Sequence, residues 1–148
     1  MFCYQCQETA GNKGCTKGGV CGKKEKTADL QDLLIYVLKG ISITAKKGGD
    51  TDEETGRFLT EALFSTITNT NFDDERIIAL IREGLKLRDN LKSENGVSGE
   101  GLDDAVTWYS DDVAAFHEKA KKIGVTSTEN EDIRSLRQLI TCLLYTSP

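Results

Sequence analysis

Residues 27–41 read TADLQDLLIYVLKGI, and their apolar side chains recur with the spacing of one face of a helix. These side chains are Leu30, Leu33, Leu34, Val37, Leu38 and Ile41. Either Thr27 or Asp29 can cap the start of the helix. The run KKGG at 46–49 supplies a cationic last turn and a glycine stop. The segment therefore predicts an amphipathic helix that buries one face.

Four more segments carry the same periodicity and predict four more helices. The second helix would start at Thr51, with Glu54 completing a capping box, and would end at residues 69–71. Its inward face would consist of Phe58, Leu59, Ala62, Leu63, Thr66 and Ile67. The third helix, capped by Asp73 or Asp74, would bury Ile77, Ile78, Ile81, Leu85 and Leu91.

A loop rich in glycine, serine and asparagine is expected over residues 93–101, ahead of the last two helices. The fourth helix follows Trp108, ends at Gly124 and would bury Val113, Phe116, Ala120 and Ile123. The fifth starts near Asn130 and would bury Ile133, Leu136, Leu139 and Ile140. The one proline is the last residue, and no segment shows sustained strand alternation. The sequence predicts an all-α fold, an antiparallel helical bundle with an N-terminal cysteine-rich loop.

The 148 residues are expected to form one domain. Residues 1–26 would be a cysteine-rich cluster-binding loop, because they are glycine-rich and hold almost no aliphatic side chains. Residues 27–142 would be the helical bundle. Residues 143–148 show no capping or periodic pattern. Our hypothesis is that they are a non-native tail and that the native chain continues as a helix.

The distribution of charge separates the first 26 residues from the rest. They carry five lysines against two glutamates, whereas the remainder has a net charge of -8. The overall net charge of -5 argues against a nucleic-acid-binding protein. No apolar run is long enough to span a membrane, and no secretory signal is visible. The sequence predicts a cytoplasmic protein, where thiols stay reduced.

Four of the five cysteines lie within 19 residues, spaced C-x2-C-x8-C-x5-C. Cys3 and Cys6 form a chelating pair, and the glycine-rich intervals allow Cys15 and Cys21 to complete the same site. Four thiolates are the usual ligands of [2Fe–2S] and [4Fe–4S] clusters. The lysines of this segment would offset the negative charge of such a cluster and raise its reduction potential. They are Lys13, Lys17, Lys23, Lys24 and Lys26.

Other readings of the cysteines remain open at this point. A structural zinc ion also accepts four thiolates, although such sites usually consist of two closely spaced cysteine pairs. Disulfide bonds fit poorly with a chain that shows no export signal. Cys142 and His117 are more typical of packing or surface positions than of metal ligands. The pairs Asp73–Asp74, Asp103–Asp104 and Asp111–Asp112 are typical of helix starts and loops, and we assign no catalytic residue in this chain.

The opening of the chain resembles that of the hybrid cluster proteins, also called prismane proteins or hydroxylamine reductases. The resemblance rests on MFCYQCQETA at 1–10, GCT at 14–16 and GGVCGK at 18–23. It extends through the helix at 27–41 and SLRQLI at 135–140. The compact cysteine spacing is similar to that of the [4Fe–4S] members of the family. The resemblance implies that Cys3, Cys6, Cys15 and Cys21 are the ligands of a [4Fe–4S] cluster.

The resemblance also implies an activity for the whole protein. Members of that family reduce hydroxylamine to ammonia and water, and nitric oxide has been proposed as a substrate. The [4Fe–4S] cluster would relay electrons from an external donor, a reductase or a ferredoxin-like protein. Catalysis would occur at a hybrid iron–sulfur–oxygen cluster held by later domains that have no counterpart here. We expect this chain alone to lack reductase activity.

Two other functions are retained as alternatives. The chain could be a small stand-alone iron–sulfur electron carrier or a zinc-binding module. Carbon monoxide dehydrogenases are related to the same family but open with a different cysteine pattern. Neither nucleic acid nor a membrane is expected as a partner.

Overall fold

A computed structural model describes residues 1–6, 8–9, 11, 14–49, 52–67 and 72–146, with side chains up to residue 140. The helices in these residues are α1 (Glu25–Gly48), α2 (Glu53–Ile67), α3 (Asp74–Glu94), α4 (Asp104–Thr107), α5 (Val113–Ile123) and α6 (Glu131–Thr146), with a short 3-10 turn, η2 (Val125–Ser127). The only pairing of extended backbone in these ranges is an isolated bridge. The all-α prediction is therefore confirmed. None of the helices within them is both long and apolar enough to cross a bilayer.

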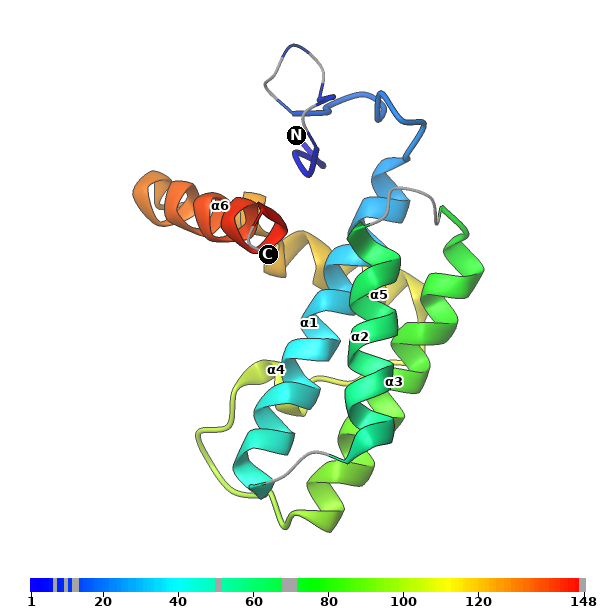
Figure 1. Cartoon of the computed structure of the whole chain (residues 1–148), viewed down its shortest axis with the longest axis vertical. Helices are drawn as coiled ribbons and strands as arrows, with labels where there is room; N and C mark the ends of the chain where they lie inside the picture. Colours follow the sequence, from blue (N-terminus) through cyan, green and yellow to red (C-terminus); the bar gives the residue numbers. More distant parts are fainter. Residues whose placement is uncertain (7, 10, 12–13, 50–51, 68–71, 147–148) are drawn as a thin grey trace.

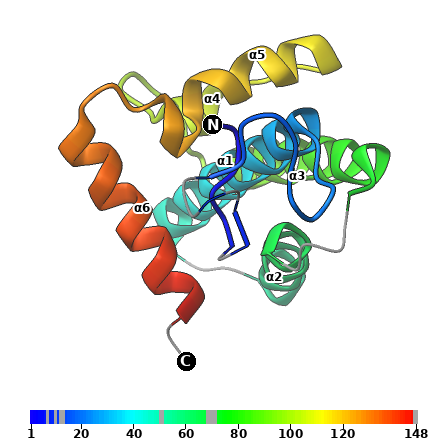
Figure 2. The ribbon, with the colours of Figure 1, turned by 90° about the horizontal axis from the view of Figure 1, so that it is seen from above.

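Helix α1 is the central element of the bundle. It contacts α2, α3, α4 and α5, and its most extensive contact is with α3. Helices α1, α2 and α3 run side by side and alternate in direction (Figure 1). Seen from above, α1 lies between α5 and α2, whereas α6 stands apart at the side (Figure 2). The view agrees with the contacts of α6, which are mainly with η2.

The core forms where the apolar faces of α1 and α3 meet. The six apolar side chains predicted for the first helix are at most 3% exposed, and those predicted for the third are at most 5% exposed. Phe116 and Ala120 of α5 complete this cluster. The periodicity of these three segments predicted their buried faces correctly, because each face has another helix to pack against.

The helix ends agree with the sequence in part. Asp73 caps α3 by accepting a hydrogen bond from the Arg76 amide (3.2 Å), and Gly49 ends α1 with φ 91°. Helix α1, however, begins at Glu25, so neither Thr27 nor Asp29 is its cap. The Thr27 hydroxyl instead donates to Asp74 Oδ1 (2.7 Å) and joins the starts of α1 and α3. Thr51 and residues 69–71 lie outside the described residues.

The inward face predicted for α6 is wrong, and that predicted for α2 is correct only in part. Ala62 and Thr66 are at most 1% exposed, and Phe58 and Leu59 pack against the core. Leu63 and Ile67 of α2 are 44% and 42% exposed. The apolar residues of α6 are more than half exposed, namely Ile133, Leu136, Leu139 and Ile140. Their periodicity is helical, but periodicity does not determine whether another element covers the face. In the part of the chain described here, α6 has almost no such element.

The sequence pattern missed α4, which is four residues long. This turn is held by the Arg88 side chain, which is 1% exposed and donates to the carbonyl oxygens of Ala105 (3.1 Å) and Trp108 (2.5 Å). Its close approach to α1 requires Gly40, where a Cβ would lie 2.2 Å from the Ala105 oxygen. Helix α6 continues to Thr146, past residue 142, where its apolar pattern ends.

Candidate metal centre

The N-terminal segment lies beyond the end of the bundle at which α1 begins (Figure 1). Its first and third cysteines are joined by backbone hydrogen bonds. The Cys15 amide donates to the Cys3 oxygen (2.7 Å), and the Phe2 amide donates to the Cys15 oxygen (2.9 Å), forming an antiparallel bridge. Residues twelve positions apart in the sequence are thus adjacent. This bridge gives the cysteine segment a fixed backbone element of its own.

Glycines shape the backbone next to two of the cysteines. Gly14 and Gly22 both have φ 91°, a left-handed conformation that other residues adopt at a cost. A Cβ at Gly14 would also lie 2.1 Å from Met1 Sδ. The Gly22 amide donates to the Gly19 oxygen (2.9 Å) and closes a tight turn around Cys21. Gly14 and Gly22 therefore allow the left-handed backbone beside Cys15 and Cys21, and Gly19, within the last cysteine interval, forms a turn with Gly22.

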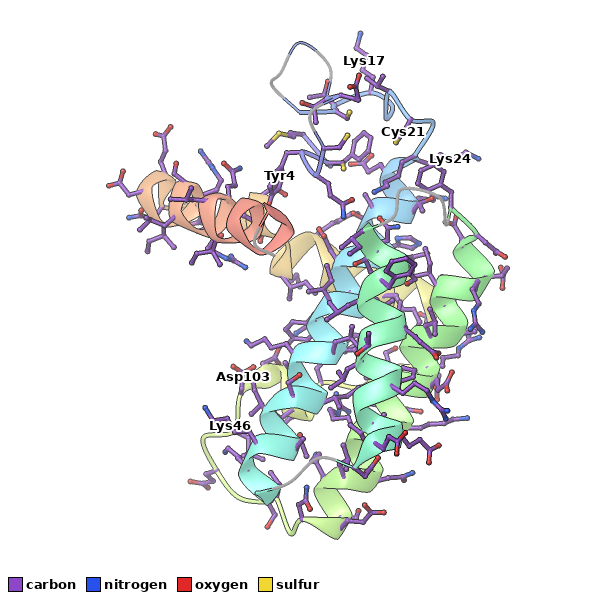
Figure 3. The ribbon with its side chains drawn as sticks, in the orientation of Figure 1. Tyr4, Lys17, Cys21, Lys24, Lys46 and Asp103 are labelled. Atoms are coloured by element: carbon purple, nitrogen blue, oxygen red, sulfur yellow. The ribbon has the colours of Figure 1, made fainter. Side chains whose placement is uncertain are left out.

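The four cysteines differ in environment. Cys15 is buried, Cys3 and Cys6 are half-buried and Cys21 is exposed, and none of the four forms a disulfide with another described cysteine. Burial raises the pKa of the Cys3 thiol; a backbone hydrogen bond at Gln5 and the Lys23 charge oppose this, and the Cys15 and Cys6 thiols add to it. Cys3, Cys6 and Cys15 therefore lie close enough to interact electrostatically. Cys21 lies in the turn just before α1, where Figure 3 shows it.

A buried lysine accompanies these thiols. Lys23 is 1% exposed, and its ammonium donates to Gln5 Oε1 (2.8 Å) between Cys3 and Cys6. The Gln5 amide donates in turn to the Thr66 oxygen near the end of α2 (2.7 Å). The Lys23 Nζ lies 5.7 Å from the centre of the Phe72 ring. This hydrogen-bonded path ties the cysteine segment to the bundle.

The sequence did not distinguish Lys23 from the lysines around it. Lys17, Lys24 and Lys26 are exposed, and Lys13 lies outside the described residues. Figure 3 shows Lys17 and Lys24 extending away from the body of the molecule. Gln5, the partner of Lys23, was visible only as a residue between two cysteines. A polar residue enclosed by predicted ligands is a weak signal, and it becomes meaningful only once the fold is known.

A cavity of about 660 Å³ adjoins the cysteine segment. Residues 2–5 and Lys23 line one side of it, and α1, α2, η2 and Arg137 of α6 contribute the others. Asp32 of α1 is among the lining residues, and Gly124 packs so closely that a Cβ there would lie 2.9 Å from Asp32 Oδ2. Burial, with a contribution from the Asp29 carboxylate, raises the pKa of Asp32 to about 7, although Lys23 and Arg137 lower it.

Asp29, three residues before Asp32 in α1, makes a polar contact with His117 of α5. Asp29 Oδ2 lies 3.4 Å from His117 Nδ1, and burial raises the pKa of Asp29 although this histidine lowers it. His117 is about one-fifth exposed. In the described part of the chain it belongs to no group of three or more histidine, cysteine, aspartate or glutamate residues that could hold a metal ion. Its boundary position agrees with the sequence reading.

The chemistry and arrangement of the four cysteine side chains limit which metal group this site could hold. A single zinc ion needs its ligand atoms within about 2.3 Å of one point. In the described ranges, no three histidine, cysteine or carboxylate side chains are arranged to hold one ion. A [4Fe–4S] cluster instead takes one thiolate on each iron, so its ligands surround a larger object. Four cysteine thiols at the end of the bundle, accompanied by a buried cation, match the ligands that such a cluster takes.

The chain is similar to known proteins over nearly its whole length. The sequence profile of the Prismane/CO dehydrogenase family matches residues 1–145. The chain is similar to hydroxylamine reductases of Halothermothrix orenii (51% identical), Clostridium novyi (53%) and Nitratidesulfovibrio vulgaris (52%). Each match covers 95% of this chain but only 28%, 27% and 27% of those relatives. The chain thus spans less than a third of their length. Its match over nearly every residue shows that it belongs to the Prismane/CO dehydrogenase family.

Proposed function

We propose that Cys3, Cys6, Cys15 and Cys21 are the four ligands of a [4Fe–4S] cluster. The observation that carries the proposal is the Cys3–Cys15 backbone bridge, which places two of the thiol-bearing residues side by side. The electrostatic interaction of Cys3 with Cys6 adds a third thiol to this group. Cys21 follows on a turn whose exposed position allows it to approach the other three.

The chain's own residues have three tasks in this proposal. The cysteines hold the cluster, the Gly14 and Gly22 turns orient them, and Gln5 ties their loop to α2. When bound, the cluster would accept and release single electrons at a potential set by nearby charge and solvent. The helical bundle serves as the rigid support for this relay.

The activity of the longer protein is also part of the proposal. It would be a hydroxylamine reductase, in keeping with the names of the relatives quoted above. Hydroxylamine would take up two electrons and two protons, its N–O bond would break, and ammonia and water would leave. The electrons would come from an external reductase or ferredoxin-like donor in the cytoplasm. A hybrid cluster, held outside the 148 residues, would be the reaction centre.

Anaerobic reconstitution of the chain with iron and sulfide tests the proposed cluster. About four irons and four acid-labile sulfides for each chain, with a paramagnetic signal on reduction, would support it. Two irons and two sulfides would replace it with a [2Fe–2S] cluster. Binding of zinc with no incorporation of sulfide would overturn it in favour of a zinc-binding module.

A further inference from the structure

Lys23 is a buried cation, and no carboxylate of the described residues forms an ion pair with it. Its side chain is 1% exposed, and lysine is almost never so buried unless it is paired. Among the described residues, its ammonium donates to the neutral Gln5 amide and lies over the Phe72 ring. An ammonium removed from water in this way is costly unless an opposite charge replaces its hydration.

Asp32 does not supply that charge in full. Both residues line the same cavity, and the Lys23 charge lowers the pKa of Asp32. No ion pair joins their side chains. Burial raises the pKa of Asp32 to about 7, so its carboxyl is partly protonated at neutral pH. Lys23 also lines the same cavity as Cys3, and its charge lowers the pKa of the Cys3 thiol.

We propose that Lys23 is the internal counter-cation of the cysteine site and holds the reduction potential of the bound cluster above the value it would otherwise have. The inference rests on the proposed cluster. An all-thiolate [4Fe–4S] cluster carries net negative charge, and reduction adds one more negative charge. A buried ammonium therefore stabilises the reduced form more than the oxidised form. An exposed lysine has a weaker effect because water and salt screen it.

Adjacent lysines provide a matched test. Lys23→Met removes the buried charge, whereas Lys24→Met removes one positive charge from an exposed side chain. Each variant and the unaltered chain would be reconstituted anaerobically and titrated with reductant while the EPR signal is followed. We expect Lys23→Met to lower the equilibrium constant for reduction at least tenfold relative to Lys24→Met. For a one-electron couple this is a shift of about 59 mV to lower potential.

The midpoint potentials of the variants either support or overturn the inference about Lys23. Equal midpoint potentials for Lys23→Met and Lys24→Met would overturn the inference. If Lys23→Met takes up no cluster, Lys23→Arg and Lys23→Gln replace it in the comparison. A potential near that of the unaltered chain in Lys23→Arg, with a lower one or no cluster in Lys23→Gln, would support a requirement for charge. Equal potentials in Lys23→Arg and Lys23→Gln, or no cluster in Lys23→Arg, would show that the shape of the side chain matters and its charge does not. Either result would overturn the inference.

The control on the unaltered chain separates this inference from the proposed function. If the unaltered chain assembles no iron–sulfur cluster, the proposed function fails. If it assembles a cluster whose midpoint potential does not depend on Lys23, only the inference about Lys23 fails.

Discussion

The amide of Cys15 donates a hydrogen bond to the carbonyl oxygen of Cys3 at 2.7 Å. This contact brings together two thiol-bearing residues from opposite sides of a glycine-rich interval. The hydrogen bond joins backbone atoms alone, so it can still form when either side chain is replaced. The thiols can therefore be changed one at a time without removing the bridge that holds their backbones.

Replacing any one of the four cysteines by serine should abolish or strongly reduce cluster assembly. Serine keeps the size and the backbone bonds but is a poorer ligand for iron than a thiolate. The measurement is iron and sulfide content with the visible absorbance of the reconstituted chain. Cys142→Ser, outside the motif, is the control and should assemble the cluster normally. Full assembly in Cys21→Ser would remove Cys21 from the ligand set.

Arg88→Met should destabilise the bundle by about 2–4 kcal/mol. The guanidinium is the donor to the Ala105 and Trp108 oxygens, so its loss leaves both carbonyls without that partner. Urea unfolding followed by circular dichroism measures the change. Arg82→Met is the control, because Arg82 is exposed and donates one longer bond to the Asp111 oxygen (3.3 Å). Equal stability of the two variants would contradict the role given to Arg88.

Gly40→Ala should cost about 1–3 kcal/mol, because the added methyl would overlap the Ala105 oxygen and force α1 and α4 apart. Gly56→Ala offers the opposite case within α2. Nothing lies within 4 Å of a Cβ there, so the alanine should stabilise the helix by about 0.5–1 kcal/mol. Thermal unfolding of both variants tests the difference in sign.

The free energy of unfolding of the metal-free chain should fall as the pH rises from about 4 to 7 through the contribution of Asp32. Its pKa is raised to about 7 in the folded chain, so the native state binds more protons than the unfolded state across this range. Asp32→Asn cannot ionise and should remove this contribution. We expect the variant to be more stable than the unaltered chain by about 1–3 kcal/mol at pH 8 and by much less near pH 4. Urea titrations at both pH values test this, and an equal difference at both would contradict it.

The reconstituted chain should show no reduction of hydroxylamine to ammonia above the background of free iron and sulfide. The physical reason is that the cysteine site offers four thiolates to a cluster and leaves no coordination position for a substrate. Ammonia formation in the presence of a chemical reductant is the measurement, and a full-length hydroxylamine reductase such as that of Clostridium novyi is the positive control. Sustained turnover by the chain would contradict the separation of relay and reaction centre.

Much of the fold was predictable from the sequence. The faces of α1 and α3 follow directly from the spacing of leucine, isoleucine and valine, and every predicted side chain on them is buried. By the same rule, the face of α6 was predicted to be buried but is exposed at Leu136, and the face of α2 is buried at Ala62 but exposed at Leu63 and Ile67. The rule identifies an apolar face, and only the arrangement of neighbouring elements determines whether that face is covered.

The cysteine motif was likewise visible in the sequence, whereas its surroundings were not. Lys23 and Lys24 are adjacent and chemically identical, and their formal charge contributes equally to the basic N-terminal segment. The tertiary structure buries Lys23 against Gln5 and Phe72 and leaves Lys24 in water. Electrostatic influence depends on burial and distance, which residue spacing does not determine. The sequence by itself determined where the four cysteines lie in the chain and predicted that they hold a cluster; the tertiary structure decided which of two adjacent lysines is buried next to them.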